Sequence, residues 1–133
     1  MKIKLIKDYE DYFQAGEIIM VYGIINKFID NLGYFPFYLV YSENNNGPLF
    51  VNAEMFVIVD GKIPSCWEVA FNPDKINVKV NSVLSENEYT INKRIVFSYP
   101  ELGSFEHEVN LWDMGQNHKI FMERKREIDT ELS

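Results

Sequence analysis

The chain has 133 residues, of which 47% are apolar and 25% charged, and these values are typical of one globular domain that needs no disulfide to fold. The formal net charge of −7 excludes the usual kind of nucleic-acid-binding protein, because a phosphate backbone is bound by clustered Lys and Arg. The longest nearly apolar run, 18–25, is too short for a membrane span, and the single cysteine, Cys66, indicates a reducing, cytoplasmic compartment.

The first half of the chain is predicted to consist of short strands separated by turns. Runs of β-branched and aromatic residues predict strands at 2–7, 17–26, 35–42 and 49–52. The sequence 44–47, Asn-Asn-Asn-Gly, predicts a hairpin turn between the last two, because Asn and Gly tolerate positive φ.

One segment of this half leaves an alternative open. Apolar residues at 18, 21, 25, 28 and 32 also fit one face of a helix over 17–32, which would make the fold α+β. The β-branched residues of this segment and the interruption at Gly23 favour a strand instead.

The second half repeats the pattern of strands and turns. Further strands are predicted at 55–59, 62–69, 75–84, 91–99 and 104–112. Asp60-Gly61 suits a type I′ turn that joins the first two as a hairpin, and 100–103, Pro-Glu-Leu-Gly, joins the last two. The charged segment 121–132 predicts a short terminal helix or a frayed end. Trp67 and Trp112 are expected in the core, and Cys66 as a buried thiol.

Short motifs in residues 1–60 resemble an SH3-like barrel. The segment 7–11, Lys-Asp-Tyr-Glu-Asp, resembles the loop-entry motif of SH3 domains, and 16–19, Gly-Glu-Ile-Ile, resembles the opening of their second strand. The segments 37–41 and 49–57 fall where the central hairpin and the short 3₁₀ turn of SH3 domains lie. The resemblance implies an SH3-like fold for this part and, as in bacterial SH3-like barrels, a role in recognition or as an adaptor.

The same motifs depart from those of peptide-binding SH3 domains. Tyr9 is retained, but Lys7 and Met55 stand where the aromatic shelf has tyrosines, and the tryptophan of the central hairpin is absent. Because polyproline peptides dock on such a shelf, the departures argue against a polyproline ligand.

The sequence therefore predicts a mainly β fold in which an SH3-like barrel is extended by additional antiparallel strands and a short C-terminal helix. We expect a single domain over 1–133, with the SH3-like part at 1–60, the additional strands at 61–118 and a charged C-terminal tail or helix at 119–133.

The sequence Glu106-His107-Glu108 is the only place where a histidine lies between two carboxylates. On a strand the two glutamates face one side and His107 the other, so we expect solvent-facing glutamates and a satisfied histidine at the edge of the core. A small enzyme remains the weakest alternative, since it requires His107 in an open pocket with Glu68, Glu88 or Asp113 nearby. His107 and His118 lack metal-ligand spacing, and no phosphate-binding loop is present; we expect no catalytic residue, metal or cofactor.

The negative charge is concentrated in residues 8–68, which hold nine acidic side chains against two lysines. Such a surface favours association with a basic protein partner. We therefore predict a small acidic protein-binding module without catalytic activity, of which an immunity-type inhibitor of a bacterial toxin is one version. A structural or regulatory accessory subunit is the alternative. The residues predicted to contact the partner are acidic or aromatic: Asp8, Tyr9, Glu10, Asp11, Tyr12, Tyr34 and Tyr38.

Overall fold

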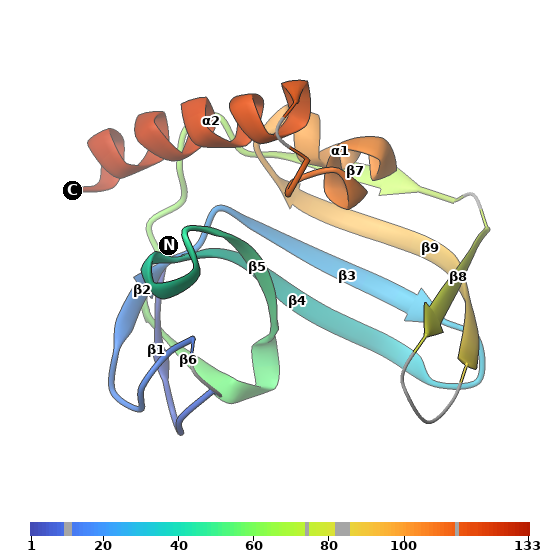
Figure 1. Cartoon of the computed structure of the whole chain (residues 1–133). Helices are drawn as coiled ribbons and strands as arrows, with labels where there is room; N and C mark the ends of the chain where they lie inside the picture. Colours follow the sequence, from blue (N-terminus) through green and yellow to red (C-terminus); the bar gives the residue numbers. More distant parts are fainter. Residues whose placement is uncertain (10–11, 74, 82–85, 114) are drawn as a thin grey trace.

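In the computed structural model the chain is mainly β, with antiparallel sheets covered on one side by helices (Figure 1). The structure describes residues 1–9, 12–73, 75–81, 86–113 and 115–133, with the side chains of 78–81 and 86–89 left out. The strands are β1 (Lys2–Leu5), β2 (Ile18–Met20), β3 (Gly23–Ile29), β4 (Gly33–Ser42), β5 (Gly47–Asn52), β6 (Phe56–Asp60), β7 (Glu68–Asn72), β8 (Ile76–Asn81) and β9 (Glu86–Ser98). The helical segments are η1 (Glu43–Asn45), η2 (Ala53–Met55), η3 (Pro100–Gly103), α1 (Phe105–Val109) and α2 (Gln116–Leu132).

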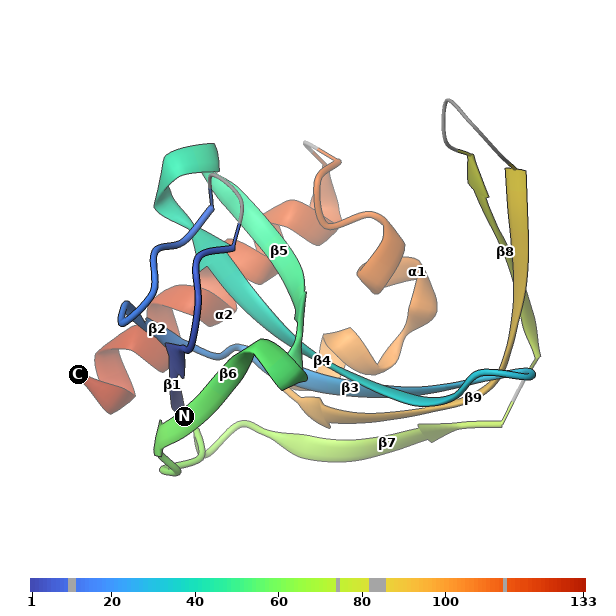
Figure 2. The ribbon, with the colours of Figure 1, turned by 90° about the horizontal axis from the view of Figure 1, so that it is seen from below.

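The strands of the described residues form two sheets. The smaller has the order β2-β1-β6, and the larger β5-β4-β3-β9-β7. Strand β9 is long enough to pair with β8 along its first part and with β7 along its last part, while β3 lies on its other side. Seen from below, the smaller sheet lies at one end of the long strands and β8 at the other (Figure 2). The SH3-like resemblance of residues 1–60 stays a prediction.

The segment 17–32 forms strands, and the alternative helix over it is not present. Gly23, at the start of β3, lies against η3: a Cβ atom there would be 2.5 Å from Leu102 and 2.9 Å from Ser98. The chain turns after β3 through Asn31 and Gly33, both with positive φ, and returns as β4. Close packing at Gly23 and this turn both require an extended segment.

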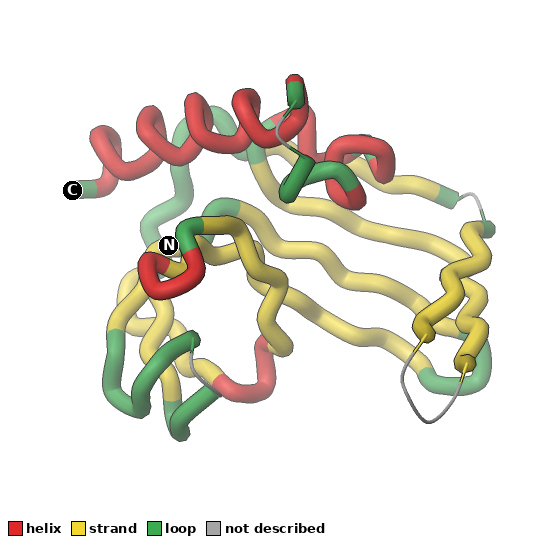
Figure 3. The backbone as a smooth tube through the Cα atoms, viewed as in Figure 1, coloured by secondary structure: helices red, strands yellow, loops and turns green. Residues whose placement is uncertain are grey.

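The predicted hairpin at 44–47 and the C-terminal helix are confirmed. Strands β4 and β5 pair around η1, and Asn46 adopts the left-handed conformation with a φ of 51°. Helix α2 has 17 residues and begins at Gln116, so it is longer than predicted and includes His118 in its first turn. Figure 3 shows it as the longest helix, lying along the larger sheet.

The predicted hairpin over 55–69 is wrong. Strand β6 pairs with β1, whereas β7 pairs with β9, so Asp60-Gly61 begins a connection between two sheets. Phe56 pairs with Leu5 and both are buried in the core, which outweighs the local turn preference of Asp-Gly. The Cys66 thiol on this connection is half-buried rather than buried.

The predicted strand over 104–112 is also wrong, because these residues form α1 and the turn after it. Pro100 begins η3, where a fixed φ and a missing N–H cost nothing, and the chain continues into α1 from Ser104. Trp112, expected in the core, is 56% exposed. Its ring covers Gly47, where a Cβ atom would be 2.1 Å from the ring.

Candidate functional site

The residues predicted to contact a partner, where the structure describes them, fall on two surfaces. In the loop before β2, the Asp8 carboxylate accepts a hydrogen bond from the Ala15 N–H (2.8 Å), and the Tyr9 and Tyr12 rings lie 6.0 Å apart. Glu10 and Asp11 lie outside the described residues. Tyr34 and Tyr38 are on β4, where the Tyr34 ring contacts Phe28 and the Tyr38 ring contacts Phe56. The five of these residues that the structure describes are therefore not one patch.

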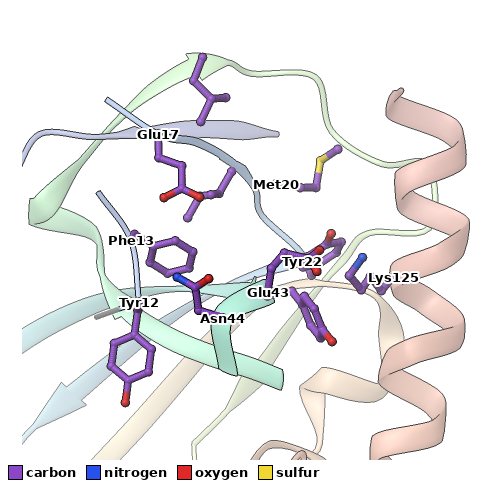
Figure 4. A pocket seen from close by; sticks show the side chains of 11 residues that line it. Tyr12, Phe13, Glu17, Met20, Tyr22, Glu43, Asn44 and Lys125 are labelled. Atoms are coloured by element: carbon purple, nitrogen blue, oxygen red, sulfur yellow. The ribbon is translucent and has the colours of Figure 1, made fainter. Parts of the chain in front are cut away.

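Tyr12 lines a pocket of about 230 Å³ between the loop before β2, η1 and α2 (Figure 4). The walls are mainly aromatic and aliphatic, and the charged side chains are two glutamates and one lysine. The lining residues are Tyr12, Phe13, Glu17, Ile18, Ile19, Met20, Tyr22, Tyr41, Glu43, Asn44 and Lys125. Of these, only Tyr12 was among the predicted contact residues.

The lysine of the pocket is already neutralised by a neighbour on α2. Lys125 Nζ lies 2.7 Å from Asp129 Oδ2, and above the rings of Tyr41 (4.9 Å) and Tyr22 (5.6 Å). The Tyr22 hydroxyl donates to the other oxygen of Asp129 at 2.6 Å. Burial, and then this hydrogen bond, raise the pKa of Tyr22, so the hydroxyl remains a donor. The remaining charge of the pocket is therefore that of Glu17 and Glu43.

The larger sheet has a second candidate surface, which we call the open face: Phe28, Tyr34, Val69, Phe71, Ile95 and Phe97. Val69 pairs with Phe97, and Phe71 with Ile95, so their side chains share one face of adjacent strands. Val69 is 69% exposed and Phe71 58%. The open face thus leaves large apolar side chains of edge strand β7 in water.

The opposite face of the same strands carries a buried charge cluster under α1. Arg94, which is fully buried, donates to Glu108 Oε1 at 2.6 Å, and Lys27 donates to Glu108 Oε2 at 2.9 Å. The ring of Phe105 lies 5.3 Å from the Arg94 guanidinium. The prediction that Glu108 faces solvent is wrong because the segment is helical, while Glu106 is exposed as predicted.

His107 is buried, with both ring nitrogens hydrogen-bonded. Nε2 accepts from the Tyr99 hydroxyl at 2.8 Å, and Nδ1 donates to Asn117 Oδ1 at 3.0 Å. It does not line the pocket of Figure 4. The enzyme hypothesis requires His107 in an open pocket, but His107 is buried in the part of the chain that the structure describes. The side chain of Glu88 lies outside the described residues.

The environment of His107 predicts a pH dependence of stability. Burial lowers the pKa of His107, although the Asn117 hydrogen bond and the charge of Glu101 oppose this. The unfolded chain then binds a proton that the folded chain does not. The contribution of the neutral His107 to stability is therefore fully present above the unfolded pKa of about 6.5. It is lost as the pH falls through the lower pKa of the folded state.

We expect the free energy of unfolding in urea to fall between about pH 7.5 and about pH 5.5. His107→Gln should flatten this fall even though it lowers stability at both pH values. Glu106→Gln is the control, because it removes an exposed carboxylate from the same helix and should leave the fall in this pH range unchanged. Equal slopes for wild type and His107→Gln would contradict the assignment.

Within the described ranges, no three His, Cys, Asp or Glu side chains come together as a metal-binding group. No helix of that part of the chain is long and apolar enough to cross a membrane. No protein-family model matches the chain, and comparisons with curated proteins and with solved structures gave no match.

Proposed function

We propose that the chain is a small acidic protein-binding module without catalytic activity and that its partner covers the open face. The observation that carries the proposal is the exposure of Val69 and Phe71 on edge strand β7. Large apolar side chains that cluster on a surface, rather than being scattered singly, mark interaction sites.

The energetics of the open face support a protein partner. Completing the burial of Val69 and Phe71 would contribute about 1–2 kcal/mol each, in proportion to the apolar area removed from water. Burying such an anchor contributes more than a charge pair at the interface rim does. The acidic surface of residues 8–68 would speed association with a basic protein.

An immunity-type inhibitor of a bacterial toxin is the more specific form of this proposal. Such an inhibitor acts by stoichiometric binding in the cytoplasm, the compartment that the single cysteine indicates. A basic toxin domain would be attracted by the net charge of −7 and held by the open face.

The test is an affinity pull-down from host lysate at low and high salt with wild type and the double variant Val69→Ser/Phe71→Ser. We expect one protein at stoichiometric level with wild type and an affinity about 100-fold lower for the variant. Ile6→Ser/Val109→Ser is the matched control, because these residues are equally apolar and exposed but lie elsewhere. Equal capture by the open-face variant and the control would contradict the proposal.

A second candidate is an accessory subunit whose edge strand completes a partner's sheet. Strand β6 is at the edge of the smaller sheet, and Val57, Ile58 and Val59 are all about half exposed. An exposed apolar edge strand is a template for strand addition. The same pull-down separates the two candidates, since a partner bound to β6 would be retained by the open-face variant.

A further inference from the structure

Strand β6 forms one edge of the smaller sheet, at the end of the molecule opposite β8 (Figure 1, Figure 2). Strand β1 pairs with one side of β6, and no strand of the described residues pairs with the other side. Val57, Ile58 and Val59 are 48%, 57% and 48% exposed. Proteins usually blunt such an edge with charged side chains, whereas this edge offers consecutive apolar residues. It is therefore suited to pairing with a further strand.

The backbone of Ile58 directs its hydrogen-bonding groups away from β1. On β1, Leu5 uses its N–H and C=O toward its other neighbour, with the Glu17 carbonyl at 3.0 Å and the Gly16 N–H at 2.8 Å. The direction of these groups alternates along antiparallel strands. Phe56, which lies opposite Leu5, and Ile58, two residues on, therefore point outward. Ile58 thus presents an N–H and a C=O at the edge.

These outward groups select one register for a second copy of β6. An antiparallel pairing with its two-fold axis at Val57 would require the Phe56 N–H, but this group already donates to the Ala53 carbonyl. With the axis at Ile58, the N–H of each Ile58 donates to the C=O of the other. Val57 of one copy then lies opposite Val59 of the second, so apolar side chains meet on both faces of the pairing.

The charges that flank β6 fit the same register. An axis at Ile58 places Glu54, which precedes the strand, at the level of Lys62 of the second copy, which follows it. Both side chains are exposed, and neither forms a salt bridge among the described residues. An axis at Val57 would instead bring Glu54 opposite Asp60, and like charges in that position are unfavourable. Opposite charges and apolar side chains therefore agree on Ile58 as the centre.

We propose that the protein forms a two-fold symmetric dimer in which the β6 strands of two copies pair antiparallel about Ile58 and join the two smaller sheets. Both copies use the same edge, so the association closes at two. The bulge at Val59, which has no residue opposite it on β1, keeps the paired segment short. Here a second copy occupies the edge that the second candidate function uses, and the open face stays available to another protein.

The experiment is sedimentation velocity of the whole chain from about 10 µM to about 1 mM. Because the contact is short, we expect a dissociation constant on the order of 100 µM, so that the mass rises from 15.7 kDa toward twice that value. Ile58→Lys should weaken the dimer at least about 10-fold, since two lysines would meet at the axis. Val109→Lys is the matched control, because Val109 on α1 is also 57% exposed. A monomer throughout this range, or equal weakening by the two variants, would overturn the proposal.

Two further measurements test the register and the surface. Glu54→Lys should weaken the dimer roughly threefold, and adding Lys62→Glu should restore it, because the two charges are then exchanged. A swap that does not restore the dimer would overturn the pairing about Ile58. Amide exchange should slow with rising protein concentration at Ile58 but not at Val57, whose N–H faces β1 at every concentration. A dimer lost in the open-face variant, with exchange at Ile58 independent of concentration, would assign dimerisation to the open face instead. Failure of the open-face pull-down would leave these results unchanged.

Discussion

Glu108→Ala is expected to lower the free energy of unfolding by about 3–5 kcal/mol, measured by urea denaturation at neutral pH. The carboxylate holds Arg94 at 2.6 Å and Lys27 at 2.9 Å, and Arg94 is fully buried. Lys27, which is partly exposed, can reach water when Glu108 is removed, but Arg94 cannot. The cost is therefore mainly that of a buried guanidinium without a counter-charge.

The matched control for this prediction is Glu106→Ala, two residues away on α1. Glu106 is exposed and only its backbone carbonyl is used, by Asn110. Its removal should change stability by no more than about 0.5 kcal/mol. Glu108→Gln, which keeps the shape and a hydrogen-bonding group, should fall between the two. If Glu108→Ala costs no more than Glu106→Ala, the charge cluster does not fasten α1 to the sheet.

Phe121→Ala should lower stability by about 3–5 kcal/mol, which corresponds to a fall in Tm of about 10–20 °C. Phe121 is a fully buried residue of α2. Its ring lies edge-on to the Tyr22 ring, with the centroids 5.7 Å apart, and is stacked on the Tyr41 ring, with the centroids 6.4 Å apart. Truncation leaves a cavity beneath the helix and removes both ring contacts. Differential scanning calorimetry measures the effect directly.

Phe121→Leu serves as the comparison because it keeps most of the apolar volume and removes only the ring. It should cost roughly 1 kcal/mol. The difference in unfolding free energy between the two variants measures the cost of the cavity. An Ala variant as stable as the Leu variant would show that α2 is held by other contacts, such as the ion pair between Arg124 and Glu101 at 2.7 Å.

What the sequence predicted correctly depends on neighbours along the chain. The turn at 44–47 follows from the left-handed preference of Asn and Gly, and the terminal helix from a run of helix-forming charged residues. The errors at 60–69 and 104–112 arose where distant partners decide the outcome. Strand β6 pairs with β1 from the start of the chain, and Glu108 turns inward because Arg94 lies beneath it.

The candidate sites also depend partly on neighbours along the chain and partly on residues that are distant in the sequence. Tyr12 was predicted from its acidic and aromatic surroundings, but Glu43 and Lys125 join it only because η1 and α2 converge on the loop before β2. In β7, alternation does place Val69 and Phe71 on one face. From the sequence alone, this apolar face would be assigned to the core. In the structure the opposite face of β7, with Ala70 and Asn72, is the covered one. A Cβ atom at Gly103 would be 2.9 Å from Ala70, and the Asn72 side chain donates a hydrogen bond to the Gly103 carbonyl.

The central claim, that the open face binds a protein, is tested most directly by photo-cross-linking in host cells from a benzophenone side chain placed at Phe71. Val109 on α1 is the control position, since it is equally exposed on the other side of the sheet. We predict one discrete protein adduct from position 71, absent from position 109 and lost when Val69→Ser is added. No adduct from position 71, or the same adducts from both positions, would contradict the account.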